Sequence, residues 1–168
     1  WFNYSAIAGY YDIEPWSDEH WKLLKKYMRD AATHAQKVIQ TVITEEPWPL
    51  SMWFGKPRPQ ATKFAYESLV KWQFDGENWN FDYTLFDRYV QTALDQGMGP
   101  WISAFSLLPF RGQPHFIYRD QQKGKVVKEK VQIGSDKWNE VWSVFLKDFS
   151  AHLKEKGWFE QTYLAFDE

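Results

Sequence analysis

The chain of 168 residues contains no cysteine, which excludes disulfide bonds and thiolate metal sites. Its 20 basic and 22 acidic residues nearly cancel and are spread evenly, without the basic stripe that suits a phosphate backbone. No apolar stretch approaches the roughly 20 residues that span a bilayer. The four histidines also lack the spacing of a metal site. We therefore expect no nucleic-acid partner, no membrane span, no metal ion and no cofactor.

The sequence also lacks an initiating methionine and the pattern of a signal peptide, because it opens directly on Trp1. Its length suits one domain with a core but is short for the larger α/β barrels. The last two residues, Asp167 and Glu168, come directly after a short run of β-branched, aromatic and apolar residues. We expect residues 1–168 to be one compact unit or part of a larger one, with a trimmed N-terminus and either a catalytic pair or a truncation at the C-terminus.

Aromatic residues, in contrast, are abundant and make up 20% of the chain. Their flat apolar faces and polar edges suit the CH face and hydroxyls of a sugar. Most should still be core residues, and Trp21, Trp138 and Trp142 lie on apolar stripes of predicted helices. The candidates for sugar stacking lie on or beside predicted loops that follow strands: Trp48, Trp53, Trp72, Trp101, Phe110 and Tyr118.

Hydrophobic periodicity and turn residues predict an alternation of strands and helices. The predicted order is a strand over 2–11, a helix over 18–36, a strand over 38–44, a hairpin over 70–81, a helix over 84–96, a strand over 99–107, a second hairpin within 108–134, a helix capped by Ser135 and ended by Gly157, and a strand over 162–166. Such alternation indicates parallel β/α units. The predicted fold class is α/β, namely the first four units of a (β/α)8 TIM-type barrel with hairpin insertions. An open doubly wound sheet is the alternative, without a glycine-rich phosphate loop to support nucleotide binding.

Polar residues at the carboxyl ends of these strands are candidates for the active site, because β/α barrels build their sites there. Asp167 and Glu168 follow the last strand, and one of two adjacent carboxyls keeps its proton near neutral pH, as glycosidic cleavage requires. A polar strand end without function is the alternative. Tyr10 and Tyr11 end the first predicted strand and could bond sugar hydroxyls. His115 lies on the insertion after the third strand, where a barrel would place substrate-binding loops; an exposed loop histidine without function is the alternative. The lysine-rich run "KGKVVKEKVQ" is typical of a solvated hairpin, which could face an acidic glycan.

Four blocks of the sequence resemble a known family. These are "YYDIEPWSDEHWKLLKKYMRDAA", "WNFDYTLFDRYV", "WNEVWSVFLKDFSAHLKEKGW" and the closing "FDE". In order and spacing they are similar to the catalytic domain of glycoside hydrolase family 123, the β-N-acetylgalactosaminidases. The resemblance implies a β/α barrel in a bacterial, secreted or periplasmic enzyme. It also implies a retaining mechanism in which the 2-acetamido group of the substrate is the nucleophile. Glu168 would be the general acid/base, and Asp167 would orient and polarise the acetamido group.

Two segments depart from the family pattern. The opening "WFNYS" lacks the expected His-Pro, and "SAFSLLPF" differs from the usual polar loop after the third strand. Both differences concern the identity of the sugar more than the reaction. The predicted function is removal of terminal β-linked N-acetylgalactosamine from a glycan or glycoconjugate. By the resemblance, residues 1–168 would be the N-terminal part of a single catalytic domain, truncated at both ends, which needs the remaining half of its barrel. The alternatives are a non-catalytic carbohydrate-binding module and an inactive fragment.

Overall fold

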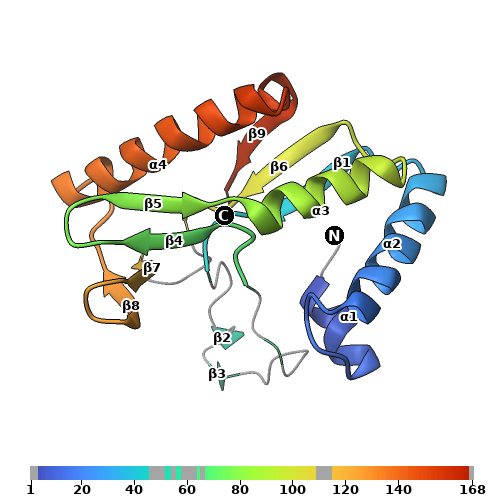
Figure 1. Ribbon diagram of the computed structural model, residues 1–168, viewed down its shortest axis with the longest axis horizontal. Coiled ribbons are helices and arrows are strands. Elements are labelled where there is room, and N and C mark those ends of the chain that lie inside the picture. The colour runs from blue at the N-terminus through green and yellow to red at the C-terminus, as the bar shows by residue number, and fades with distance from the viewer. Residues whose placement is uncertain are drawn as a thin grey trace.

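The computed structural model describes residues 4–45, 52–53, 56–57, 64, 67–108 and 115–166. The helices are α1 (Tyr4–Tyr11), α2 (Asp18–Thr33), α3 (Thr84–Asp95), α4 (Asp136–Glu155) and the short 3-10 helix η1 (Phe159–Gln161). The strands are β1 (Val38–Val42), β2 (Met52–Trp53), β3 (Lys56–Pro57), β4 (Lys71–Phe74), β5 (Trp79–Asp82), β6 (Trp101–Phe105), β7 (His115–Asp120), β8 (Lys125–Lys130) and β9 (Thr162–Ala165). The chain is therefore a mixed α/β structure (Figure 1).

Three parallel strands form the first sheet, in the order β1-β6-β9. The pairing brings Val38 opposite Trp101 and Ile102 opposite Thr162. A hairpin and then a helix lie between each strand and the next: β4–β5 and α3 precede β6, and β7–β8 and α4 precede β9. These two units agree with the predicted alternation of strands and helices. The described residues form no closed barrel.

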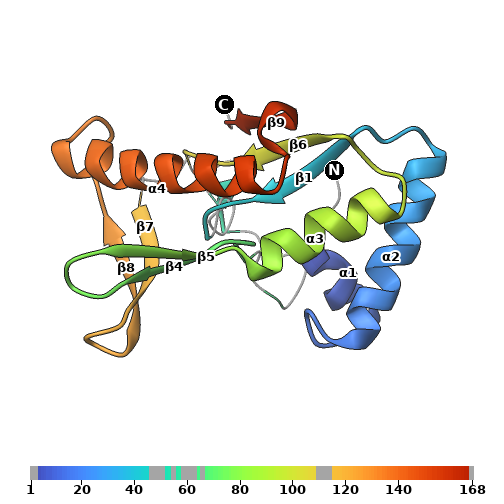
Figure 2. The ribbon, with the colours of Figure 1, turned by 45° about the horizontal axis from the view of Figure 1, so that its top comes forward.

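The two hairpins combine into a second, mixed sheet in the order β5-β4-β7-β8. β4 and β7 run parallel and pair at Gln73 with Arg119, while both hairpins are antiparallel as predicted. Figures 1 and 2 show this sheet beside α4, at the opposite end of the molecule from α1 and α2. The hairpins are therefore one structural layer and not two separate insertions.

The first predicted strand is wrong, because residues 4–11 form α1. Ser5, Ala6, Ile7 and Ala8 are small or apolar and are compatible with a helix, and Ser5 and Ala8 are buried. The Tyr4 hydroxyl donates a hydrogen bond to the Glu67 carbonyl. Tertiary contacts of this kind override the local strand preference of aromatic residues.

The predicted helices otherwise form close to their expected bounds. Ser17 Oγ accepts the backbone N–H of His20 at 3.2 Å, and Ser135 Oγ accepts that of Trp138 at 3.2 Å. Each serine satisfies a backbone donor that the first helical turn leaves free. α2 ends three residues before the predicted Gln36, since Ala35 has a φ of 61°.

An aromatic cluster forms the core between α4 and the mixed sheet. Trp72 stacks on Phe145 with ring centroids 4.5 Å apart and on Phe116 at 5.9 Å. The predicted core positions Trp21 and Trp142 are buried, and Trp138 packs against the same core while partly exposed. Much of the aromatic content therefore serves packing, as expected for most of these residues.

No described helix has the length and apolarity needed to cross a membrane.

Candidate active site

The carboxyl ends of β1, β6 and β9 lie at one edge of the parallel sheet, where the predicted site should be (Figure 1). Thr44 Oγ1 donates to the Ser106 carbonyl at 2.9 Å, which joins the segments that leave β1 and β6. The peptide bond between Phe105 and Ser106 is cis. Phe166 follows β9 and is 57% exposed. Asp167 and Glu168 come next in the sequence and lie outside the described residues, so their catalytic roles stay predictions.

A half-buried carboxylate, Glu45, lies just beyond the end of β1 and was not among the residues expected from the sequence. Its Oε2 accepts the backbone N–H of Ser68 at 2.9 Å, and its Oε1 lies 3.4 Å from Lys71 Nζ. Burial raises the pKa of Glu45 above its ordinary value, while the Lys71 ammonium acts in the opposite direction. Lys71 also lies 3.1 Å from Glu67 Oε2. The edge of the sheet therefore carries a carboxyl group that holds its proton more readily than the carboxyl group of an ordinary glutamate.

Further hydrogen bonds fasten the mixed sheet to this edge. Trp72 Nε1 donates to the Ile43 carbonyl at 2.8 Å, and Leu69 N donates to the Val42 carbonyl at 2.8 Å. Ser68 Oγ accepts the N–H of Val70 at 3.1 Å. Because these contacts join β4 directly to the segment after β1, the hairpin sheet has a fixed position beside the carboxyl edge.

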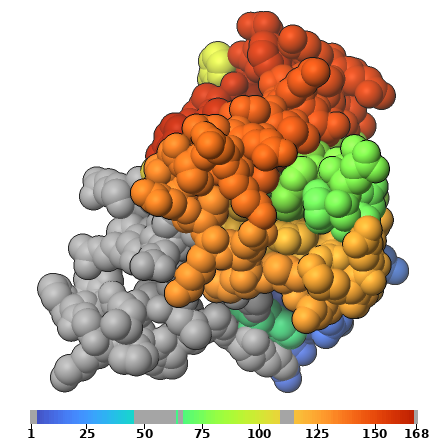
Figure 3. Space-filling view, turned by 90° about the vertical axis from the view of Figure 1, so that its left-hand side faces the viewer, coloured from blue at the N-terminus to red at the C-terminus, as the bar shows by residue number. Residues whose placement is uncertain are grey.

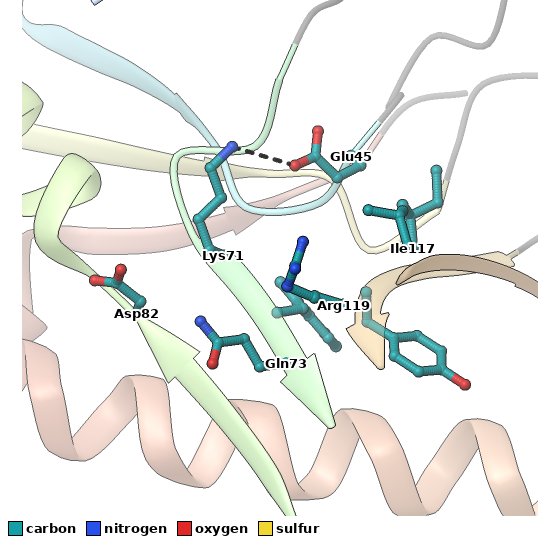
Figure 4. A pocket seen from close by; sticks show the side chains of 9 residues that line it. Glu45, Lys71, Gln73, Asp82, Ile117 and Arg119 are labelled. Atoms are coloured by element: carbon teal, nitrogen blue, oxygen red, sulfur yellow. Dashed lines mark hydrogen bonds and ion pairs between the residues drawn. The ribbon is translucent and has the colours of Figure 1, made fainter. Parts of the chain in front are cut away.

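Glu45 and Lys71 share a hollow of about 290 Å³ with residues of the mixed sheet (Figure 4). Figure 4 shows Lys71 and Arg119 extending from neighbouring strands on the side where Glu45 lies. Asp82 also lines the hollow, and its hydrogen bonds from Thr84 lower the pKa of its carboxyl. Gln73 and Ile117 complete the labelled lining. The hollow thus offers two cations, two carboxylates, an amide and an apolar wall, a suitable mixture for a polar ligand.

Two of the predicted sugar-stacking residues are largely buried instead of exposed on loops. Trp72 lies in the middle of β4 and is only 5% exposed, because its indole fills the core against α4. Tyr118 lies within β7 and donates its hydroxyl to Glu129 Oε2 at 3.0 Å. Burial raises the pKa of Tyr118 to about 12. Both residues border the hollow, so the structure brings them near the candidate site, but their predicted loop positions are wrong.

Trp101, Tyr10 and Tyr11 do not lie at the carboxyl edge. Trp101 is the first residue of β6, at the opposite end of the strand, and is 48% exposed. Tyr10 and Tyr11 end α1 and not a strand, and the Tyr11 hydroxyl lies 3.0 Å from that of Tyr27 on α2. Sugar binding by these three residues was predicted from positions at strand ends or on loops after strands. The structure places all three elsewhere.

His115 is the first residue of β7 and is half-buried, opposite Lys130 in the hairpin. Trp48 and Phe110 lie outside the described residues, as does the side chain of Trp53. Over the ranges that the structure describes, no three His, Asp or Glu side chains are grouped to hold a metal ion.

Sequence reasoning missed Glu45 although a signal was present. Glu45 follows a β-branched strand just as Asp167 does, and the same rule about strand ends applies to it. Lys71 carried no such signal, because its contact with Glu45 spans 26 residues of sequence.

Comparisons with known proteins give a family match and a similar solved structure. The family model for the catalytic domain of glycoside hydrolase 123 matches residues 1–168. Among solved structures, the chain is similar to a family 123 glycoside hydrolase from Clostridium perfringens, which was analysed for the details of glycolipid glycan hydrolysis. The TM-score is 0.85 and the sequence identity is 26%; the similarity covers 100% of this chain and 28% of that one. No curated protein sequence matches the chain.

Proposed function

The chain belongs to the catalytic-domain family of glycoside hydrolase 123, and from this premise we propose that it is part of a glycosidase that removes terminal β-linked N-acetylgalactosamine. The reaction retains the anomeric configuration, and the 2-acetamido group of the substrate is the nucleophile. The observation that carries this proposal is the family match over residues 1–168, together with an Asp-Glu pair that follows the last parallel strand.

In the proposed mechanism the two terminal carboxyl groups have different roles. Glu168 donates a proton to the glycosidic oxygen while the acetamido oxygen attacks the anomeric carbon, and Asp167 orients and polarises the acetamido group. Glu168 then accepts a proton from the water that opens the cyclic intermediate. The adjacent negative charge of Asp167 would help to keep Glu168 protonated before the first step.

We also propose that β1, β6 and β9 are consecutive parallel strands of a (β/α)8 barrel. Their shared carboxyl edge and the helix between each pair of strands support this proposal. The neighbour from Clostridium perfringens is much longer than the present chain. On this proposal the isolated 168 residues are inactive, because the sugar pocket needs the other half of the barrel.

The proposed function is tested on the protein at its natural full length. A chromogenic β-N-acetylgalactosaminide should be hydrolysed, and Glu168→Gln should lower kcat by about 10²- to 10⁴-fold, the usual contribution of a general acid. Glu160→Gln is the matched control, because Glu160 is an exposed glutamate of η1, and it should leave kcat unchanged. Full activity of Glu168→Gln would disprove the catalytic assignment. Sugar binding without turnover by the unmutated protein would instead favour a carbohydrate-binding module.

A further inference from the structure

The mixed sheet β5-β4-β7-β8 has two faces of different chemistry. One face carries Trp72, Phe81 and Phe116, which pack against Trp142 and Phe145 of α4. Because side chains alternate along a strand, Lys71, Gln73, Ile117 and Arg119 belong to the other face. This second face, here called the hollow face, contains the hollow beside Glu45.

The charges of the β7–β8 hairpin are sorted between these faces. Residues directly opposite one another in an antiparallel pair share a face, so Lys128 opposite Ile117 and Lys130 opposite His115 lie on the hollow face with Arg119. The acidic side chains of the hairpin lie on the α4 face and are neutralised there. Asp120 lies 2.6 Å from Lys123, and Glu129 contacts Lys137 of α4. The hairpin therefore presents three cations and no carboxylate on the hollow face.

Two hydrogen-bond donors in the hollow have no acceptor in the part of the chain that the structure describes. The Arg119 guanidinium is exposed and makes no hydrogen bond or ion pair there. Gln73 uses its Oε1 to accept Gln121 Nε2 at 2.7 Å, which leaves its amide N–H groups available. Gln73 and Arg119 are directly paired across β4 and β7. Val126, opposite Arg119, is 64% exposed and adds an apolar wall.

We propose that the hollow face binds an anionic substituent, a carboxylate or a sulfate ester, on a second sugar of the glycan substrate. Arg119 forms a bidentate, charge-assisted pair with the anion, Gln73 donates an additional hydrogen bond, and Lys130 adds a positive charge on the same face. The volume of about 290 Å³ is close to the lower end of the range for ligand sites, roughly 300–1,000 Å³. This inference rests on the proposed function, since Glu45 connects the hollow to the carboxyl edge of the catalytic sheet.

Figure 3 shows that the β7–β8 hairpin, in gold and orange, lies at the surface beside the green β4–β5 hairpin. A substituent several bonds away from the terminal sugar could therefore reach this end of the molecule from solvent. An acidic glycan is favoured over an anionic membrane because the donors converge in a hollow and are not spread over a flat surface.

The test compares three synthetic oligosaccharides that end in the same β-linked N-acetylgalactosamine. The second sugar is neutral in one, carries a carboxylate in another and carries a sulfate ester in the third. With the full-length protein, kcat/KM should be about tenfold higher for at least one anionic substrate, since charge-assisted hydrogen bonds are among the strongest in proteins. Arg119→Gln should remove this preference and leave the neutral substrate unchanged within about twofold, the scatter expected of a surface substitution.

Lys125→Gln is the matched control. It removes one positive charge from the same hairpin, but Lys125 lies opposite Asp120 and thus on the α4 face. The control should leave the preference for the anionic substrate intact. Arg119→Lys, which keeps the charge but loses the bidentate geometry, should give an intermediate preference. Arg119 is exposed, and unchanged thermal unfolding of each variant excludes a folding defect.

The remaining outcomes separate this inference from the proposed function. Equal kcat/KM on all three substrates, or an equal loss on all three in Arg119→Gln, overturns the inference while the glycosidase assignment stands. If the unmutated protein hydrolyses none of them, the proposed function fails. In that case calorimetry measures binding of the anionic oligosaccharides directly. Binding that is lost in Arg119→Gln supports the inference, and absence of binding overturns it. Arg119-dependent binding to phosphatidylserine vesicles without binding of the glycans also overturns it, in favour of a membrane surface.

Discussion

Lys71 Nζ lies 3.4 Å from Glu45 Oε1 and so joins β4 of the mixed sheet to the segment that leaves β1 of the parallel sheet. The Glu45 carboxylate also accepts the Ser68 N–H. These contacts fix a hairpin layer beside the edge where barrel enzymes place their chemistry. They also leave the titratable Glu45 half-buried, which has consequences for stability.

The first prediction concerns the pH dependence that Glu45 causes. Burial raises its pKa above the ordinary value of 4.5, so between 4.5 and the raised value the folded chain binds more protons than the unfolded one. The contribution of Glu45 to the free energy of unfolding must then fall as pH rises through this interval. Glu45→Gln, which keeps an acceptor for Ser68, should lack this decrease.

Urea unfolding of the two proteins at several pH values above 4.5 measures this difference. The stability of the unmutated protein relative to Glu45→Gln should decrease steadily as pH rises. An increase with pH would instead show that the attraction of Lys71 outweighs the effect of burial.

The second prediction separates packing from sugar binding at Trp72. Its indole stacks on Phe145 and donates to the Ile43 carbonyl. Trp72→Ala should therefore lower the free energy of unfolding by about 3–5 kcal/mol, the usual cost of emptying a large aromatic site. Trp72→Phe cannot donate this hydrogen bond and should lower the free energy of unfolding by about 1–2 kcal/mol.

Trp101→Ala is the control for Trp72. The side chain of Trp101 is half exposed at the start of β6, so its removal should change the free energy of unfolding by no more than about 1 kcal/mol. A similar loss at both positions would contradict the core role of Trp72.

Local signals in the sequence predicted most helices and strands correctly. Ser17 and Ser135 mark helix starts because their side chains bond to nearby backbone groups, and the turn at Gly76 separates two alternating runs. Such contacts lie within a few residues and can be read directly. The segment 4–11 has the pattern of a strand but forms α1, which depends on distant contacts such as that between Tyr4 and Glu67.

The candidate site was less accessible to sequence reasoning than the fold. A rule about strand ends indicates Asp167 and Glu168 after the last strand, and the same rule applies to Glu45 after β1. Gln73 of β4 pairs with Arg119 of β7, a residue 46 positions later in the sequence. No local pattern indicates which insertions pair with each other, so the hollow face could not be predicted.

The third prediction concerns His20, a buried residue at the start of α2. Its Nδ1 accepts the N–H of Trp16 at 2.9 Å, and its Nε2 lies 3.0 Å from the Tyr4 carbonyl. This arrangement needs the neutral ring with the proton on Nε2. Burial lowers the pKa of His20 below its ordinary value of 6.5, so the unfolded chain binds the proton first as pH falls.

The contribution of His20 to the free energy of unfolding should therefore be greatest above pH 6.5 and decrease as pH falls below it, toward the lowered pKa of the folded state. His20→Gln cannot titrate and should lack this decrease. Urea unfolding between pH 5 and 8 compares the two proteins. If both lose stability equally below pH 6.5, another group is responsible.

The fourth prediction tests the proposed nucleophile and needs no mutation. If the acetamido oxygen of the substrate attacks the anomeric carbon, the reaction rate must depend on the electron density of that oxygen. Replacing the acetyl group by fluoroacetyl, difluoroacetyl and trifluoroacetyl, with the leaving group unchanged, withdraws electrons from that oxygen step by step. Each step should lower kcat. The trifluoroacetyl substrate should be slower by at least about tenfold, which corresponds to only about 1.4 kcal/mol in the barrier. A kcat that does not change with fluorination would indicate that a protein carboxylate or water attacks directly. In that case Asp167 would be the first candidate for the attacking group, since retaining glycosidases of the other type use a carboxylate for this step.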